Sequence, residues 1–95
     1  MRKYEVMIII DPDVDDRQVQ PLVERHLKTI TDGKGTVDGV DIWGRRRLSY
    51  DINKKSDGIY AVLTLTAEPA VVSELDRLLT IDEQVMRTKV MRLDD

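Results

Sequence analysis

The sequence predicts an α+β fold in which a four-stranded antiparallel sheet carries two helices on one face. Three observations lead to this prediction. Two stretches have apolar residues at helical spacing, four stretches have the alternation typical of strands, and 95 residues hold one domain with one core. The hydrophobic fraction of 41% is sufficient for such a core. We therefore expect a single domain over residues 1–95.

The first strand and the first helix are predicted from the N-terminal third of the chain. Apolar side chains alternate over residues 3–10, and Pro12 then ends the strand. A helical stripe follows from about residue 15, made of Val19, Leu22, Val23, Leu27 and Ile30. Pro21 lies inside this stripe, so either the first helical turns are distorted or regular winding begins at Pro21. The glycines in residues 32–35 predict the helix end and a turn.

The middle of the chain predicts two further strands. Residues 36–50 are rich in β-forming side chains, but their alternation slips near Gly44, which indicates a bulge or bend. Residues 53–58 are polar and predict a turn. Residues 59–66 alternate again and predict the third strand.

The last third predicts a short helix and a final strand. Pro69 suits a first helical position, and an apolar stripe follows it, made of Val71, Val72, Leu75, Leu78 and Leu79. Residues 85–93 return to strand, with Arg87 and Lys89 on one exposed face. For the core we select nine apolar residues, which are Val6, Ile8, Ile10, Val23, Leu27, Leu63, Leu65, Leu75 and Leu78.

The predicted order is strand, helix, strand, strand, helix, strand. Two split βαβ halves with right-handed crossovers give the ferredoxin-like βαββαβ arrangement. In this arrangement the first and third strands lie centrally, which fits their being the two most apolar strands.

The chain is acidic overall and basic in one stretch. Fifteen Lys and Arg against 18 Asp and Glu give a net charge of -3 at pH 7, which argues against a general binder of polyanions. Yet residues 45–55 hold five basic residues and one acid, whereas residues 11–16 hold four aspartates. The chain can therefore offer one face to phosphates and another to a cationic protein.

Several function classes lack the residues or segments that they require. The absence of cysteine excludes disulfides, thiolate metal sites and thiol nucleophiles. No apolar run approaches the ~20 residues of a membrane span, and the residues after Met1 alternate like a strand instead of forming a signal peptide. We therefore expect no membrane partner and a cytoplasmic location.

Enzymatic and metal chemistry find little support in the residues. His26 is the only histidine, and its place beside an apolar stripe predicts a structural or surface role. Asp11, Asp13 and Asp15 alternate as calcium ligands do, but the sixth and twelfth loop positions lack the required Gly and Glu. A hydrolase of phosphate esters or acyl phosphates would need an anion-binding glycine loop after the first strand, which is missing. The sequence thus implies no catalytic residue, metal, cofactor or small-molecule substrate.

A basic and aromatic stretch is the most informative part of the chain. Three successive arginines at 45–47 lie between Trp43 and Tyr50, and Tyr60 follows a little later. Because neighbouring residues of a strand point to opposite sides, at least one arginine must lie against the helix side, at the sheet edge or on a bulge. Guanidinium groups fork phosphate or carboxylate oxygens, and exposed rings stack on unpaired bases. For each ring taken singly, the alternative is a place in the core.

Several segments together resemble one protein family. They are the opening Met1-Arg2-Lys3-Tyr4-Glu5-Val6-Met7, the Asp11-Pro12-Asp13 turn, the segment Gly44-Arg45-Arg46-Arg47-Leu48-Ser49-Tyr50 with Ile52 and Lys54, and Gly58 with Tyr60. In kind, order and spacing they resemble the sixth protein of the bacterial small ribosomal subunit, over essentially the whole chain. One departure is Asp51, where the family often has proline.

The resemblance implies a structural, ribosome-associated protein that binds the central domain of 16S ribosomal RNA together with the small, basic eighteenth protein of the same subunit. A local basic patch then suffices, because each neutralised phosphate releases counterions. The first and fourth strands are neighbours in this fold, so their basic ends can form one patch. We assign RNA contact to Arg2, Lys3, Lys54, Lys55, Arg87, Lys89 and Arg92. We assign the interface with the partner protein, or with the RNA beside it, to Arg45, Arg46, Arg47 and Tyr50.

Two other function classes remain open. A regulatory or small-molecule-binding ferredoxin-like module would bind metabolites and would show no salt-sensitive RNA binding. A hydrolase would turn over acyl phosphates.

Overall fold

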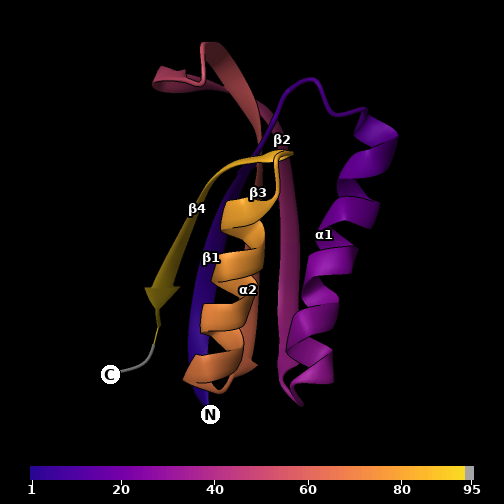
Figure 1. Ribbon diagram of the computed structural model, residues 1–95, viewed down its shortest axis with the longest axis vertical. Coiled ribbons are helices and arrows are strands. Elements are labelled where there is room, and N and C mark those ends of the chain that lie inside the picture. Colours follow the sequence, from indigo (N-terminus) through magenta and orange to yellow (C-terminus); the bar gives the residue numbers. More distant parts are fainter. Residues whose placement is uncertain (94–95) are drawn as a thin grey trace.

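The computed structural model describes residues 1–93 and contains four strands and two helices. In chain order these are β1 (Arg2–Ile10), α1 (Asp16–Asp32), β2 (Thr36–Ile52), β3 (Lys55–Ala67), α2 (Pro69–Ile81) and β4 (Val85–Arg92). The strands form an antiparallel sheet in the order β2-β3-β1-β4, so the first and third strands lie centrally as predicted. Both helices lie on one face of the sheet (Figure 1). The predicted ferredoxin-like α+β fold is confirmed.

The hydrophobic core lies between the helices and the sheet. Eight of the nine residues selected for it are buried there, namely Val6, Ile8, Ile10, Val23, Leu27, Leu63, Leu65 and Leu75. The selection of Leu78 was wrong, because Leu78 is partly exposed and Leu79 is fully buried instead. With 100° per residue, Leu78 lies about 90° around α2 from the direction that its buried residues share. Within residues 1–93, neither helix is long and apolar enough to span a membrane.

The start of α1 is set by a side-chain cap. The carboxylate of Asp15 accepts a hydrogen bond from the backbone N–H of Arg17 at 2.9 Å, which satisfies one of the unpaired donors of the first turn. The helix therefore begins at Asp16, and Pro21 lies inside it. The alternative in which regular winding begins at Pro21 is wrong. Pro69 is the first residue of α2, as its fixed backbone angle predicts.

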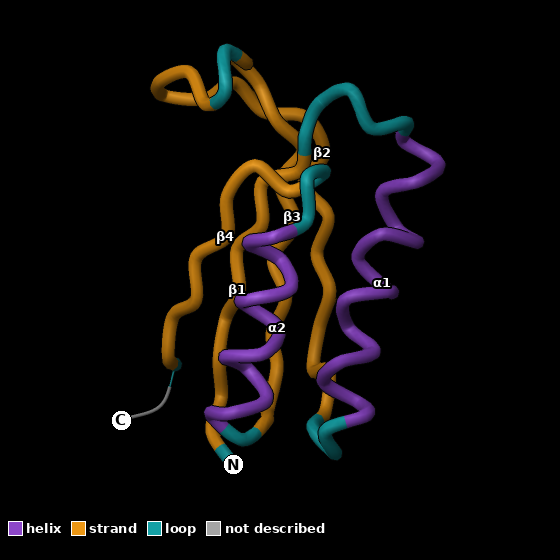
Figure 2. The backbone as a smooth tube through the Cα atoms, in the orientation of Figure 1, coloured by secondary structure: helices purple, strands orange, loops and turns teal. Residues whose placement is uncertain are grey.

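The β2–β3 hairpin is longer than the sequence predicts. Its turn comprises only Asn53 and Lys54, both at positive φ (50° and 65°), and Ile52 pairs directly with Lys55. The predicted polar turn over residues 53–58 is therefore wrong, because a two-residue turn of this hand matches the twist of the two strands and lets Ile52 pair with Lys55. The pairing of β2 with β3 is interrupted by a register shift between Arg47 and Ile52. The bulge near Gly44 is confirmed by a register shift and a φ of 84°. Figure 2 shows that the hairpin tip bends sideways, at the end of the molecule away from the N-terminus.

Candidate nucleic-acid and protein interface

The bulge at Gly44 sorts the three successive arginines onto different sides of the sheet. After the bulge, Arg45 pairs with Ile59, which points into the core, so Arg45 lies on the helix side. Arg46 pairs with Gly58 and points to the open side. Of the three places predicted for at least one arginine, which were the helix side, the sheet edge and a bulge, Arg45 takes the helix side. We call residues 45–58, which contain five bases, the basic hairpin.

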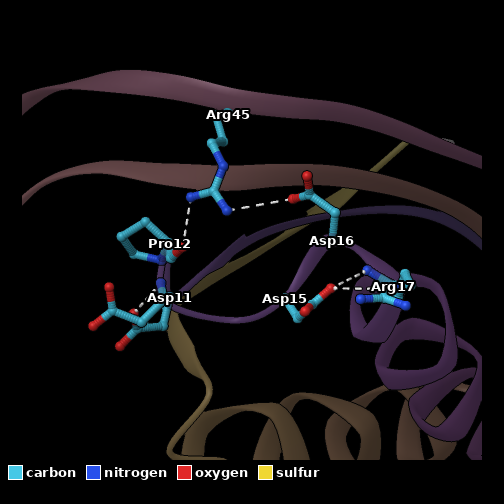
Figure 3. Close-up of polar contacts among 7 residues, drawn as sticks. Asp11, Pro12, Asp15, Asp16, Arg17 and Arg45 are labelled. Atoms are coloured by element: carbon cyan, nitrogen blue, oxygen red, sulfur yellow. Dashed lines mark hydrogen bonds and ion pairs between the residues drawn. The ribbon is translucent and has the colours of Figure 1, made fainter.

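Arg45 is held by the loop between β1 and α1, which we call the acidic turn (residues 11–16). Its guanidinium donates one hydrogen bond to the backbone carbonyl of Pro12 and another to the Asp16 carboxylate at 3.3 Å. Figure 3 shows the side chain reaching from β2 toward this turn. The charge of Arg45 is therefore already compensated within the chain.

Lys55 contacts the same turn from β3. Its ammonium group donates a hydrogen bond to the Asp13 carboxylate and lies 3.9 Å from Asp11 Oδ1. The hydrogen bond to Asp13 raises the pKa of Lys55, with a smaller contribution from the charge of Asp11. Lys55 is thus the second base of the hairpin whose charge is compensated internally.

The acidic turn is shaped by hydrogen bonds to its own backbone. The Asp11 carboxylate accepts the Asp13 N–H at 2.8 Å, and Asp15 caps α1. These short side chains favour such local bonds to nearby N–H groups. Of the alternating aspartates that resemble a calcium loop in sequence, Asp11 therefore closes the turn, Asp15 caps the helix and Asp13 holds Lys55. The neighbouring Asp16 holds Arg45.

The other bases of the hairpin have no such partner. None of the carboxylates described in residues 1–93 forms an ion pair with Arg46, Arg47 or Lys54, and all three side chains are exposed. Lys54 stands at the tip of the hairpin. These three cations are therefore available to an external anion.

The hairpin folds back toward β4 on the open side of the sheet. The guanidinium of Arg87 donates a hydrogen bond to the Tyr50 hydroxyl and lies 5.4 Å from the ring centroid. Beneath this contact, Leu48 and Ile9 are both buried. A Cβ at Gly58 would lie 2.5 Å from Ile9 Cγ2, so glycine permits this close packing. The fold-back brings the hairpin beside the bases of β4.

The aromatic rings of this region are exposed rather than packed in the core. Trp43 and Tyr60 stack with centroids 6.1 Å apart and planes 3° apart, and Trp43 remains 42% exposed. Tyr50 is 58% exposed. The interpretation that rings fill the core is therefore wrong for Trp43 and Tyr50, and Tyr60 is half-buried beneath Trp43.

The residues assigned to RNA contact fall into separate groups. Arg92 pairs with Tyr4, so it lies near Arg2 and Lys3 at the end of the sheet where the chain begins. Arg87 pairs with Ile9, about 17 Å farther along β1 at 3.3 Å per residue. Arg87 and Lys89 share the open side and lie toward the hairpin, whose tip carries Lys54. Lys55 lies apart from both groups, against the acidic turn.

A buried polar contact that the sequence does not reveal joins the two helices. His26 Nε2 on α1 lies 2.7 Å from Asp82 Oδ2 at the end of α2, and Arg25 contacts the same oxygen at 3.1 Å. Burial alone would raise the pKa of Asp82, but hydrogen bonds from His26 and from the Gln84 N–H hold it below the ordinary value of 3.8. His26 thus has a structural role, as predicted. In the sequence, the only signal was a lone histidine beside an apolar stripe.

These features are those of a macromolecular binding surface. Exposed cations and rings are spread over a sheet and a hairpin, and the buried His26 and half-buried Asp82 join two helices instead of lining a cleft. This geometry favours the class of small α+β proteins that bind another macromolecule over catalysts of small-molecule reactions.

Comparisons with known proteins agree with this class. The family described as Ribosomal protein S6 matches residues 3–92 of the chain. The small ribosomal subunit protein bS6 of Cutibacterium acnes is 71% identical over 97% of this chain and 96% of its own. That of Streptomyces coelicolor is 60% identical with the same coverage. The crystal structure of the 30S ribosomal protein S6 of Thermotoga maritima superposes with a TM-score of 0.90 at 32% identity, covering 97% of this chain and 87% of that chain.

The chain belongs to the ribosomal protein S6 family. It is therefore a structural component of the small ribosomal subunit that acts in translation, and it is not an enzyme. The resemblance found in the sequence is confirmed.

Proposed function

We propose that the protein binds the central domain of 16S ribosomal RNA together with the small, basic eighteenth protein of the small subunit, in the cytoplasm. The observation that carries the proposal is the group of exposed cations without a carboxylate partner in residues 1–93, namely Arg46, Arg47 and Lys54. Phosphates meeting these groups release counterions, which favours binding despite the net charge of -3.

The structure supports different roles for different groups of the basic residues in this proposal. Arg87 and Lys89 lie beside the hairpin on the open side, so they extend the same RNA-contacting surface. Arg2, Lys3 and Arg92 form a second contact point at the opposite end of the sheet. Arg46, Arg47 and Tyr50 are the exposed hairpin residues available to the partner protein or to the RNA beside it. Arg45 and Lys55 act indirectly, since they hold the hairpin against the acidic turn.

The test is co-sedimentation with small ribosomal subunits, followed by RNA binding with purified components. We expect the protein to sediment with small subunits and to be released at high salt. We also expect salt-sensitive binding to a central-domain RNA fragment that is much weaker without the eighteenth protein. Affinity for metabolites without salt-sensitive RNA binding would instead support a regulatory ferredoxin-like module and would refute the proposal.

A further inference from the structure

Ser49 lies in the basic hairpin, two residues after the three successive arginines. It is exposed, and no hydrogen bond to its hydroxyl is found within residues 1–93. The hydroxyl therefore holds no other part of the fold in place, and a modifying enzyme can reach it. Its position among the exposed cations makes any charge added to it relevant to RNA binding.

The backbone around Ser49 is held less tightly than the rest of β2. Arg47 pairs with Asp57 and Ile52 pairs with Lys55, so residues 48–51 of β2 lie opposite residue 56 alone. On its other side, β2 pairs with no strand described in residues 1–93. Within residues 48–51 only the first side chain is buried. An enzyme that binds its substrate as extended backbone can therefore take up this segment without breaking a pair of the sheet.

The residues before Ser49 have the charge pattern that one class of serine kinases selects. Arg46 and Arg47 stand three and two positions before Ser49, and both are exposed without an ion pair to any carboxylate described in residues 1–93. Kinases with carboxylates in their peptide groove pair with arginines at these two positions. The other two serines of the chain, Ser56 and Ser73, have no arginine at either position. The pattern therefore singles out Ser49.

A phosphate on Ser49 would stand among bases that we assign to RNA contact and to the partner interface. Ser49, Tyr50 and Arg87 line a cavity of ≈120 Å³ where the hairpin folds back toward β4. A phosphoserine carries about 1.5 to 2 negative charges at pH 7, and its oxygens accept paired hydrogen bonds from guanidinium groups. It would compensate Arg47 and Arg87 within the chain, and its remaining charge would repel RNA phosphates.

We propose that Ser49 is the phosphorylation site of a serine kinase that selects arginines, and that its phosphate keeps the free protein from binding RNA. The kinase transfers the γ-phosphoryl group of ATP to Ser49 Oγ. The new P–O bond forms as the bond to the departing ADP breaks, and the hydroxyl proton passes to a base of the kinase. This inference rests on the proposed function and adds a way of regulating it.

Phosphorylation of the full chain in vitro tests the site. The probe is a purified serine kinase that selects arginines three and two positions before the serine, supplied with magnesium and ATP. Mass spectrometry should find phosphate on Ser49, and Ser49→Ala should accept none. If a synthetic peptide of residues 44–52 is phosphorylated and the full chain is not, the fold conceals Ser49 and the proposal is overturned. Equal phosphorylation of Ser73 would also contradict it.

Filter binding of the phosphorylated chain tests the effect of the phosphate. With the eighteenth protein present at about 0.1 M salt, its affinity for the central-domain RNA should be at least about tenfold lower than that of the unmodified chain. Equal affinity of the two forms overturns this inference and leaves the proposed function standing. If the unmodified chain does not bind this RNA, the proposed function fails, and the inference with it.

A matched pair of variants separates the position of the charge from the charge itself. Ser49→Asp adds one negative charge to the hairpin, and we expect it to weaken RNA binding about threefold, less than the phosphate does. Ser73→Asp makes the same change at another exposed serine, which lies on α2, and should bind like the unmodified chain. Circular dichroism and thermal unfolding establish that both variants are folded. Equal binding by the two variants contradicts the proposal.

The protein isolated from the cells that produce it gives the last test. Mass spectrometry should find phosphate on Ser49 in the fraction that is free of ribosomes, and at least about tenfold less of it in small subunits, since the modified form does not assemble. Phosphate in equal proportion in both fractions would overturn the regulatory role. Its absence from both fractions would overturn the site as well.

Discussion

The basic hairpin contains two sets of cations that are neighbours in sequence and differ in their partners. Arg45 and Lys55 lie against the acidic turn and are compensated within the chain. Arg46, Arg47 and Lys54 are exposed, and no carboxylate described in residues 1–93 pairs with them. Alternation after the bulge at Gly44 turns Arg45 and Arg46 to opposite sides, but contact with the acidic turn decides which bases have a structural role. Arg47 lies on the same side as Arg45 and has no ion-pair partner within residues 1–93.

The acidic turn explains how an acidic protein can present cations to RNA. Its carboxylates cap α1 and hold two bases of the hairpin, so they lie on the helix side, whereas Arg46 and Arg87 point to the open side. Exposed ion pairs of this kind add little to stability. Their effect is mainly geometric, because they join the hairpin to the start of α1.

The largest effect is expected in the salt dependence of RNA binding, which should distinguish the exposed cations from the compensated ones. Arg46→Ala combined with Lys54→Ala should lower the slope of log affinity against log salt by about two, because each lost phosphate contact contributes about one. Affinity for the central-domain RNA at 0.1 M salt should fall about tenfold for each charge. Filter binding over a salt series with the eighteenth protein present measures both.

The matched control for this pair removes the same formal charge from the compensated set. Arg45→Ala combined with Lys55→Ala should change the slope by less than about one, since these bases already pair with the acidic turn. Equal slopes for the two double variants would show that the compensated and exposed sets do not differ in function.

A smaller effect is expected on the free energy of unfolding, from the contact between His26 and Asp82. This contact is less exposed than the ion pairs of the hairpin. Asp82→Asn should lower the free energy of unfolding at pH 7 by about 2 kcal/mol, because it weakens the hydrogen bonding of a half-buried carboxylate to His26 and Arg25. The folded pKa of Asp82 is depressed, so its contribution is present above about 3.8 and is lost as the pH falls through the folded pKa. Urea unfolding between pH 7 and pH 2 should therefore show a smaller acid-induced loss in the variant.

Glu83→Gln is the control for the Asp82 prediction. Glu83 is exposed and adjacent in sequence, so its replacement should leave both the stability and its pH dependence nearly unchanged. If Asp82→Asn matched this control across the whole pH range, the buried contact would have no stabilising role.

The smallest effect concerns stability within the hairpin. Arg45→Ala should lower the free energy of unfolding by about 0.5 kcal/mol, because its hydrogen bonds to Pro12 and Asp16 are lost. Arg46→Ala should have no measurable effect, since its side chain makes no ion pair within residues 1–93. The midpoints of urea unfolding, measured for both variants under the same conditions, test this prediction. A larger loss of unfolding free energy for Arg46→Ala than for Arg45→Ala would reverse the structural roles assigned to the two arginines.

Much of the fold follows from local patterns in the sequence. The order of strands and helices, the central place of β1 and β3, the bulge at Gly44 and the start of α2 at Pro69 were all predicted. Each depends on side-chain periodicity or on the backbone limits of glycine and proline, which act over a few residues. The family resemblance could be recognised in the sequence for a similar reason, because it consists of short segments that occur in a fixed order.

The composition of the hairpin could also be read from the sequence, but its division into two sets could not. The contacts of Arg45 with Pro12 and of Lys55 with Asp13 join residues 33 and 42 positions apart. His26 meets Asp82 across 56 positions. Periodicity carries no information about such pairs, because they arise only when the packed helices and sheet bring distant segments together. Tertiary packing therefore settled which cations are held and which stay exposed, whereas local chemistry had already settled the elements that carry them.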